Sequence, residues 1–182
     1  MQDLPRSYHH GNLPPALVAT AVTMIGESGD WRFTLRDLAA RAGVSHAASY
    51  KHFADKSALL AAVAAEGFTR LHAALADVVE NWDGRADGRA RCHALAEAYV
   101  LFGEANPGLF RLMSGADGGA GAGLDAPAAQ VRRLLRAACG GQGEASGMAF
   151  WALLHGMTLL WLDGCMEGVV PAAVVEALLE RV

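Results

Sequence analysis

The segment from Thr34 to Lys56 most constrains how this chain can fold, because its helix caps and apolar spacing describe two short helices joined by a sharp turn. Thr34 is a preferred N-cap residue, and Gly43, which lacks a Cβ atom, can adopt the left-handed conformation that ends a helix. Ser45 can then cap a second helix from about His46 to Phe53. After the first cap, apolar residues recur at the spacing of one buried helix face: Leu35, Leu38, Ala39 and Ala42. The segment therefore predicts a helix-turn-helix.

This segment resembles the DNA-binding part of the TetR/AcrR family of bacterial transcriptional regulators. One residue departs from the family pattern: Ser49 stands where many members carry a larger apolar residue or proline, which predicts a slightly weaker local core. Two further stretches also resemble the family, residues 8–13 at the start of its first helix and Trp151, His155 and Gly156, the Trp-His-Gly signature of one C-terminal domain class. In order, the matching residues of the helix-turn-helix are Thr34, Leu38, Ala39, Ala42, Gly43, Val44, Ser45, Tyr50, Lys51, His52, Phe53 and Lys56.

The whole chain is expected to be all-α, because no stretch shows the alternation of apolar and polar residues that a strand requires. The expected fold is a three-helix DNA-binding domain over residues 1–58 and a helical bundle over residues 59–182, with about nine helices in all. A long helix from about Lys56 to Asn81 is expected to join the two parts. The other expected helices are residues 13–27, a helix capped by Asp87 and reaching about residue 105, 108–113, 125–139, 144–166 and 171–181.

The glycine-rich stretch from Ser114 to Gly123 is expected to be a disordered loop. A phosphate-binding loop is the alternative, but the Lys-Ser/Thr pair of that motif does not follow. Hydrophobic residues make up 53% of the chain, which predicts a large core, a buried subunit interface, or both.

Several features predict a soluble, cytoplasmic protein that does not enter a membrane. Charged or polar residues interrupt the apolar stretches well before the roughly 18 residues of a membrane-spanning helix, and residues 1–17 lack the apolar core of a signal peptide. Cys92, Cys139 and Cys165 are widely spaced and odd in number, which suits reduced thiols. They form no metal-ligand cluster, and we expect neither a metal nor a cofactor.

Charge is distributed unevenly along the chain. The net charge is −4, yet residues 1–60 carry six Lys and Arg against five Asp and Glu, while the remainder carries nine against fourteen. The N-terminal part is therefore the basic side, where the motif places DNA. The asymmetry is small, so it predicts weak non-specific binding to DNA at physiological salt.

The second helix of the motif is expected to enter the major groove of double-stranded DNA, with His46, Ala47 and Tyr50 nearest the bases. Imidazole and methyl groups can contact base edges, and the hydroxyl, ammonium and imidazole groups that follow suit phosphates. The family resemblance implies that Thr34 and Arg36 approach the DNA as well. The alternative is an ordinary corner of a helical bundle. The full candidate set is Thr34, Arg36, Ser45, His46, Ala47, Tyr50, Lys51, His52 and Lys56.

The C-terminal part resembles the family's regulatory domain, which binds a small molecule and forms the dimer. A spacing of four residues places Trp151 and His155 on one helix face, where they can line a pocket for an apolar or aromatic effector. The alternative is that these side chains only form core, with His155 bonded to a backbone or hydroxyl group. The other candidate lining residues are Phe102, Phe110, Met113 and Met148.

The last two helices are unusually apolar and predict a homodimer through a four-helix interface. Such a dimer would hold two recognition helices about 34–36 Å apart, or a small multiple of that spacing. The interface is expected to include Leu153, Leu154, Met157, Leu160, Trp161, Val174, Val175, Leu178 and Leu179.

These features together predict a sequence-specific regulator, a repressor that leaves a palindromic operator when a small effector binds. An enzyme is the first alternative, since His93, Glu97, Glu104 and His155 are acid–base groups, but no nucleophile or metal spacing accompanies them. The second alternative is a helical ligand-binding or interaction protein that has lost DNA binding. The intact basic and aromatic residues of the motif argue against it.

Overall fold

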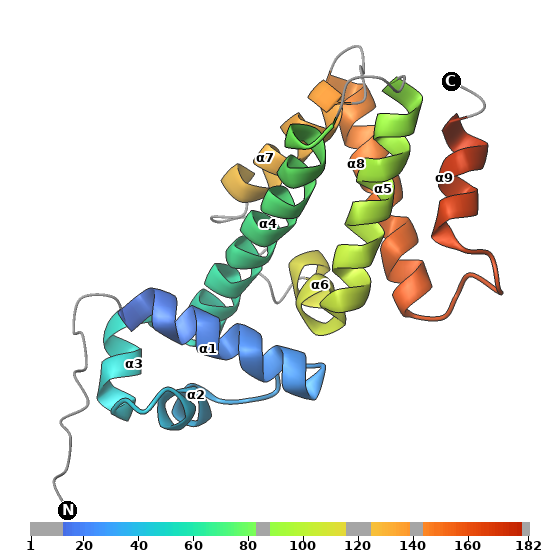
Figure 1. Cartoon of the computed structure of the whole chain (residues 1–182). Helices are drawn as coiled ribbons and strands as arrows, with labels where there is room; N and C mark the ends of the chain where they lie inside the picture. The colour runs from blue at the N-terminus through green and yellow to red at the C-terminus, as the bar shows by residue number, and fades with distance from the viewer. Residues whose placement is uncertain (1–12, 83–87, 116–124, 139–143, 180–182) are drawn as a thin grey trace, which may run out of the picture.

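The computed structural model describes residues 13–82, 88–115, 125–138 and 144–179, except the side chains of residues 125, 144–146 and 178–179. Its described residues form nine α-helices and no strand, which confirms the all-α prediction (Figure 1). The helices are α1 (Leu13–Ser28), α2 (Leu35–Arg41), α3 (His46–His52), α4 (Lys56–Glu80), α5 (Gly88–Ala105), α6 (Pro107–Ser114), α7 (Asp125–Ala138), α8 (Glu144–Leu162) and α9 (Pro171–Leu179).

Helices α1, α2 and α3 form a small unit at one end of the molecule, and α4 runs from that unit along the bundle formed by the later helices (Figure 1). Helix α4 packs against α1, α5, α6 and α7, while α8 and α9 pack against α5. The proposed domain boundary after residue 58 falls within the first turn of α4, so one continuous helix crosses it. A movement of the bundle can therefore reach the small unit through a rigid element.

The turn between α2 and α3 follows from its sequence. Gly43 has a φ of +69°, which a residue without Cβ adopts without strain. The Gly43 amide donates to the Ala40 carbonyl at 3.2 Å and the Val44 amide donates to the Ala39 carbonyl at 2.9 Å. This pair of hydrogen bonds is the Schellman motif, which satisfies carbonyls at the end of a helix. The turn fixes the angle at which α3 leaves α2.

Both helices of the motif have the caps that the sequence predicts. The Thr34 hydroxyl accepts from the Asp37 amide at 3.1 Å, and the Asp37 carboxylate accepts from the Thr34 amide at 2.8 Å, which completes a capping box. These bonds from the Thr34 backbone and hydroxyl lower the pKa of Asp37. The Ser45 hydroxyl accepts from the Ala48 amide at 3.2 Å at the start of α3.

Three predicted helix ends need correction or cannot be compared. Helix α8 ends at Leu162 and not at Met166, because Gly164 turns the chain with a φ of +71°. Two other predicted helix ends lie outside the described residues, the cap Asp87 and the end of the last helix at residue 181. Most of the predicted loop from Ser114 to Gly123 also lies outside them. The other described helix ends agree with the prediction to within about two residues.

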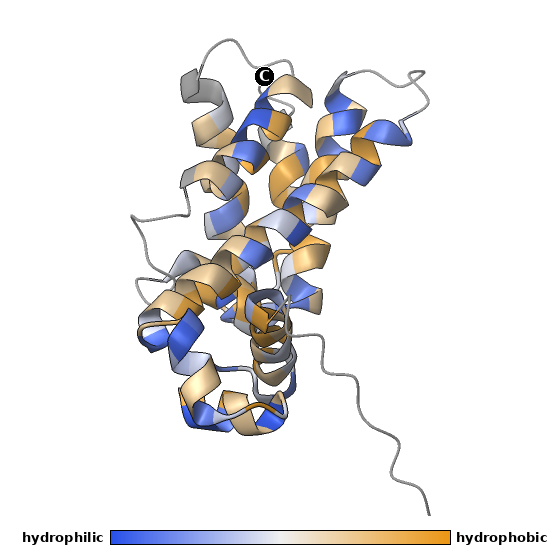
Figure 2. Cartoon of the chain, turned by 90° about the vertical axis from the view of Figure 1, so that its left-hand side faces the viewer, coloured by the Kyte–Doolittle hydropathy of each residue, from blue (hydrophilic) through white to orange (hydrophobic). Residues whose placement is uncertain are grey.

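Helix α4 is long and apolar enough to cross a membrane by length and composition alone, with a mean hydropathy of 1.2 over its 18-residue window. Its apolar residues instead form the centre of the core: Leu59, Leu60, Val63, Phe68, Leu71 and Leu75 are buried against four neighbouring helices. Hydrophilic and hydrophobic residues alternate along the helices in Figure 2. Helix α4 therefore has the contacts of a central core helix.

The apolar residues assigned to a dimer interface are partly used within one chain. Leu154, Met157 and Val175 are buried in the core of the single chain, which corrects their assignment to a subunit interface. Leu160 remains 54% exposed, and Leu153, Trp161 and Val174 are half-buried. The Leu178 and Leu179 side chains lie outside the described residues.

Candidate nucleic-acid interface and regulatory core

The outer face of α3 carries the side chains that the sequence placed on DNA. His46, Ala47, Lys51 and His52 are exposed, and Tyr50 is 48% exposed. The rings of His46 and Tyr50 meet edge to face with their centroids 4.8 Å apart, as residues four apart on one helix face do. Their mutual contact limits the rotamers of both side chains. The helix therefore presents a partly ordered polar and aromatic surface.

The opposite face of α3 is held in place at Ser49. This residue is fully buried, and its hydroxyl donates to the His46 carbonyl at 2.8 Å. A buried hydroxyl with a hydrogen-bond partner costs little, whereas an unpaired one would cost about 1–3 kcal/mol. The departure from the family pattern is therefore accommodated inside the helix itself. Phe53, buried where α3 ends, completes the packing of the small unit.

Not every predicted DNA-contacting side chain is free to bind. The hydroxyls of Thr34 and Ser45 are engaged in the helix caps, so both side chains hold the helix-turn-helix in shape. Lys56 is half-buried, with its Nζ 5.6 Å from the centroid of the Phe33 ring. Arg36 is exposed at the start of α2. The exposed candidates thus lie on α3 and α2, whereas Thr34, Ser45 and Lys56 make contacts within the fold.

A second group of chemically distinctive residues surrounds His155 in the bundle. The Tyr99 hydroxyl lies 2.8 Å from His155 Nδ1, and the Ser114 hydroxyl lies 2.7 Å from His155 Nε2. The Phe110 ring lies with its centroid 4.9 Å from that of the imidazole, and the Trp151 ring 5.3 Å from it. We call these five residues, Tyr99, Phe110, Ser114, Trp151 and His155, the His155 cluster. It joins α5, α6 and α8.

The Phe110 carbonyl, which can only accept, fixes the direction of each hydrogen bond in the His155 cluster. The Ser114 hydroxyl donates to the Phe110 carbonyl at 2.8 Å, so it must accept a hydrogen bond from His155 Nε2–H. Nδ1 is then the acceptor for the Tyr99 hydroxyl. This arrangement uses both ring nitrogens of a neutral imidazole. Burial favours the same form, since it lowers the pKa of His155 to about 4 and raises that of Tyr99 well above its usual value.

One polar group of the cluster is only weakly satisfied. The buried Trp151 Nε1–H group interacts with the Tyr99 hydroxyl, which lowers the pKa of Tyr99 against the effect of burial, but no contact with full hydrogen-bond geometry satisfies it among the described residues. A buried donor without a partner costs free energy that an incoming acceptor would recover. The cluster therefore has one weakly paired donor that a bound molecule could engage, although its rings are packed against one another.

The predicted effector-lining residues do not all come together. Phe110 is fully buried and Phe102 is half-buried, while Met113 is buried against α4, where a Cβ atom on Gly67 would lie 2.6 Å from its sulfur. Met148 is 47% exposed and lines a different cavity between α7 and α8, which corrects its placement beside His155.

Sequence reasoning missed Tyr99 and Ser114. Tyr99 follows Cys92, Leu95 and Ala96 on the buried stripe of α5. A tyrosine on such a stripe must bury its hydroxyl with a partner, so the signal was available.

Helix α6 connects this cluster to the DNA-binding unit. A Cβ atom on Gly108, near its first turn, would lie 2.9 Å from the Gly29 carbonyl oxygen and 2.9 Å from the Ile25 side chain at the end of α1. Six residues on, Ser114 bonds to His155. One short helix therefore touches both parts of the molecule.

Comparisons with known proteins agree with this two-part arrangement. The family description "Bacterial regulatory proteins, tetR family" matches residues 17–63, which include α2 and α3. The description "Tetracyclin repressor-like, C-terminal domain" matches residues 92–182, half of the chain. The chain belongs to the TetR family of bacterial transcriptional regulators. Its membership of the Trp-His-Gly class stays a prediction.

Curated relatives of this TetR-family chain include the nucleoid occlusion factor SlmA of Idiomarina loihiensis, 32% identical over 103 residues, which are 54% of this chain and 49% of that protein. SlmA of Shewanella pealeana is 34% identical over 95 residues, 51% of this chain and 46% of that protein. The chain thus spans about half the length of the curated relatives it matches.

Solved structures resemble the TetR-family chain over most of its length. A Rhodococcus sp. RHA1 protein described as having unknown function is 38% identical, with a TM-score of 0.73 over 97% of this chain and 96% of that one. A Streptomyces coelicolor TetR-family regulator is 18% identical, with a TM-score of 0.68 over 94% and 99% of the two chains, and shows the shared fold.

In the part of the chain that the structure describes, no group of three or more His, Cys, Asp or Glu residues is placed so that it could hold a metal ion. Cys92 is buried and Cys165 is exposed, and neither belongs to a disulfide among the described residues. Cys139 lies outside the described residues.

Proposed function

We propose that this TetR-family chain is a dimeric, sequence-specific repressor that leaves its operator when a small molecule binds in the bundle. The observation that carries the proposal is the exposed face of α3, fixed by the Schellman turn at Gly43 and by the caps of α2 and α3. A helix held at a defined angle with its polar face free can enter a major groove. We assign His46, Ala47 and Tyr50 to the bases.

Phosphate contacts come from the residues around that face. Lys51 and His52 in the last turn of α3 and Arg36 on α2 are exposed cations or donors. Lys56, held over the Phe33 ring, is placed at the start of α4. Phosphate contacts fix the position of a protein on the duplex without reading its sequence. Thr34 and Ser45 support these residues by capping the two helices.

Two copies of the chain are needed to read a palindrome, because one α3 contacts one half-site. Large apolar side chains remain exposed on the bundle, including Leu101 and Leu160 at 54% and Val169 and Val170 at 49%. They favour a subunit interface on the side of α8 and α9. We propose the cytoplasm as the location, where the operator DNA lies.

Effector release fits the His155 cluster and its connection through α6. An apolar or aromatic molecule with one acceptor atom can satisfy the Trp151 Nε1–H group and separate the rings around His155. Ser114 would then move with α6, whose first turn touches Gly29 of the DNA-binding unit. A ligand that favours one position of α6 shifts the population between DNA-bound and free states.

Enzymatic activity is not part of this proposal. His93, Glu97 and Glu104 do line one groove between α5 and α9, but His155 lies in the separate cluster. Glu104 accepts a hydrogen bond from Trp161 Nε1 at 2.6 Å, and the groove is lined by no serine, cysteine, threonine or lysine. The groove thus offers acid–base groups, but no nucleophile paired with a base is among its lining residues. The role named for the SlmA relatives is not transferred, since the likeness covers half of each protein.

Selection of bound sequences from a random pool of double-stranded DNA tests the proposal. Enrichment of a palindrome is expected from the wild-type chain, and its affinity can then be measured by fluorescence anisotropy at several salt concentrations. Replacing Tyr50 and Lys56 together by alanine should abolish binding while leaving the helical circular dichroism signal unchanged. Lys51→Ala should weaken binding to all sequences and reduce the slope of log affinity against log salt by about 1.

Arg89→Ala is the matched control, because Arg89 is an exposed arginine at the start of α5, in the bundle and not in the DNA-binding unit. It removes one positive charge, as Lys51→Ala does, so it should leave the salt slope unchanged. Equal effects of the two changes would show that net charge and not the α3 surface controls binding. Failure to enrich any sequence would favour a helical ligand-binding or interaction protein with degenerate DNA binding.

A further inference from the structure

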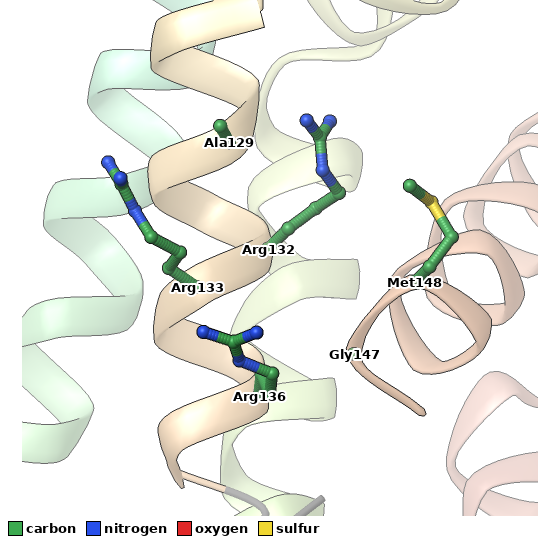
Figure 3. A pocket seen from close by; sticks show the side chains of 6 residues that line it. All are labelled: Ala129, Arg132, Arg133, Arg136, Gly147 and Met148. Atoms are coloured by element: carbon green, nitrogen blue, oxygen red, sulfur yellow. The ribbon is translucent and has the colours of Figure 1, made fainter. Parts of the chain in front are cut away.

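A cavity of about 310 Å³ lies between α7 and α8, away from the α3 surface and next to the His155 cluster at Trp151. Figure 3 shows its lining side chains, with Arg132 reaching from α7 toward the helix that carries Met148. The volume is at the lower end of the roughly 300–1,000 Å³ that small-molecule pockets enclose. Its lining consists of Ala129, Arg132, Arg133, Arg136, Gly147 and Met148. We call it the α7–α8 cavity.

The charge of this cavity is strongly positive. Arg132 and Arg136 are four residues apart on α7 and so lie on neighbouring turns of one helix face, while Arg133 is exposed and points to the other side of the helix from Arg132 (Figure 3). Like charges at this spacing repel one another. Every ion pair found among the described residues belongs to another arginine, at positions 32, 41, 70 and 111. A bound anion would relieve the repulsion.

Two of the three arginines are held in place by their surroundings. The Cζ atom of Arg132 lies 5.2 Å from the centroid of the Trp151 ring, a cation–π contact that holds the guanidinium against α8. The stem of Arg136 packs on Gly147, where an added Cβ atom would lie 2.8 Å from Arg136 Cβ. Glycine at this position therefore lets α8 approach the arginine. Side chains ordered before binding lose less entropy when a ligand arrives.

The lining also has an apolar edge. Met148, half-exposed on α8, and Ala129 on α7 face the same cavity as the guanidinium groups. A ligand that fills the cavity would thus place an anionic group among the arginines and an apolar group against the methionine. Arginine forks bind phosphate and carboxylate oxygens in pairs, and a phosphate monoester offers three oxygens and nearly two negative charges. The i, i+4 pair Arg132 and Arg136 offers two guanidinium groups to those oxygens.

We propose that the α7–α8 cavity binds a phosphate monoester with a small apolar or aromatic substituent. The site is distinct from the His155 cluster, which offers a neutral imidazole and an indole N–H group but no cation. Trp151 stands between the two, since its ring contacts both Arg132 and His155. Binding at this cavity does not depend on operator release, so either proposal can fail without the other.

Isothermal titration calorimetry of the full chain with phenyl phosphate tests the proposal directly. Inorganic phosphate and benzyl alcohol serve as probes of the two halves of the ligand. We expect saturable binding of phenyl phosphate at one site per chain, weaker binding of inorganic phosphate and no measurable binding of benzyl alcohol. Arg132→Gln and Arg136→Gln should each raise the dissociation constant by about tenfold or more, the effect of losing one charge-assisted hydrogen bond.

Two further variants separate the site from general charge and from folding. Arg89→Gln removes the same charge from an exposed position on α5 and should change the dissociation constant by less than about twofold. Gly147→Ala keeps all three arginines but displaces the Arg136 stem, so it should weaken binding while the net charge stays the same. Thermal melts of each variant check that the bundle remains folded.

Two results would overturn the proposal. Wild-type protein that shows no saturable heat with phenyl phosphate at millimolar concentration has no such site. Equal weakening by Arg89→Gln, Arg132→Gln and Arg136→Gln would show only non-specific attraction of anions. If the first result is found, loss of DNA binding in an Arg132→Gln, Arg136→Gln double variant would assign the arginines to DNA.

Discussion

The contact between α6 and α1 predicts that Gly108→Ala destabilises the protein. In the native structure an added Cβ atom would lie 2.9 Å from the Gly29 carbonyl oxygen, 2.9 Å from the Ile25 Cγ2 atom and 3.0 Å from the Gly29 carbonyl carbon. Two of these three atoms belong to the backbone of a turn whose φ of +75° is set by Gly29. Backbone atoms cannot rotate away as a side chain can, so the two helices must separate slightly.

The expected size of the effect comes from two opposing contributions. Overpacking a close contact costs about 1–3 kcal/mol, and replacing glycine by alanine in a helix recovers up to about 1 kcal/mol. We therefore expect the free energy of unfolding to fall by about 1–2 kcal/mol. For a chain of this length each kcal/mol corresponds to about 2–4 °C. The melting temperature should fall by roughly 2–8 °C.

Urea denaturation followed by circular dichroism measures this change, at one fixed protein concentration because an oligomer melts in a concentration-dependent way. Gly156→Ala is the matched control, since a Cβ atom at this helical position would meet nothing within 4 Å. It should be neutral or slightly stabilising, by at most about 1 kcal/mol. If Gly108→Ala proves as stable as Gly156→Ala, the close approach of α6 to α1 is not present in solution and the proposed route from bundle to DNA loses its support.

Two further predictions concern the cluster and the helix caps. Because burial lowers the pKa of His155 from 6.5 to about 4, the unfolded chain takes up a proton below pH 6.5 that the folded chain takes up only near pH 4. The contribution of His155 to the free energy of unfolding should therefore fall by about 3 kcal/mol between pH 7.5 and pH 4. In urea titrations, His155→Gln should flatten this part of the pH profile. An unchanged slope would contradict a buried neutral imidazole. Thr34→Ala should cost about 0.5–2 kcal/mol and weaken operator binding, whereas Thr34→Ser should restore both because it keeps the cap. Operator binding that stays weak in Thr34→Ser, at wild-type stability, would indicate that the threonine methyl group itself contacts DNA.

Local sequence patterns predicted the helices well because each pattern acts over a few residues. Thr34, Ser45 and Gly43 cap or end their helices as expected, since a cap needs only its own side chain and the next turn. The same reasoning placed the end of α8 too late, because it gave Gly164 no weight as a stop. The exposed face of α3 also followed from helix periodicity alone.

The grouping of residues far apart in the sequence required the tertiary structure. Met148 and Trp151 are neighbours on α8, yet the crossing with α7 places Met148 on an arginine-lined cavity and turns the Trp151 ring onto both Arg132 and the His155 cluster. Periodicity assigns a residue to a helix face but does not say which helix that face meets. The amino-acid sequence by itself determined the helix-turn-helix and the helical class, because hydrogen bonds between near neighbours specify them. Only the packing of α5, α6 and α8 decided that Tyr99, Ser114 and His155 meet, since those contacts join residues 41 to 56 positions apart.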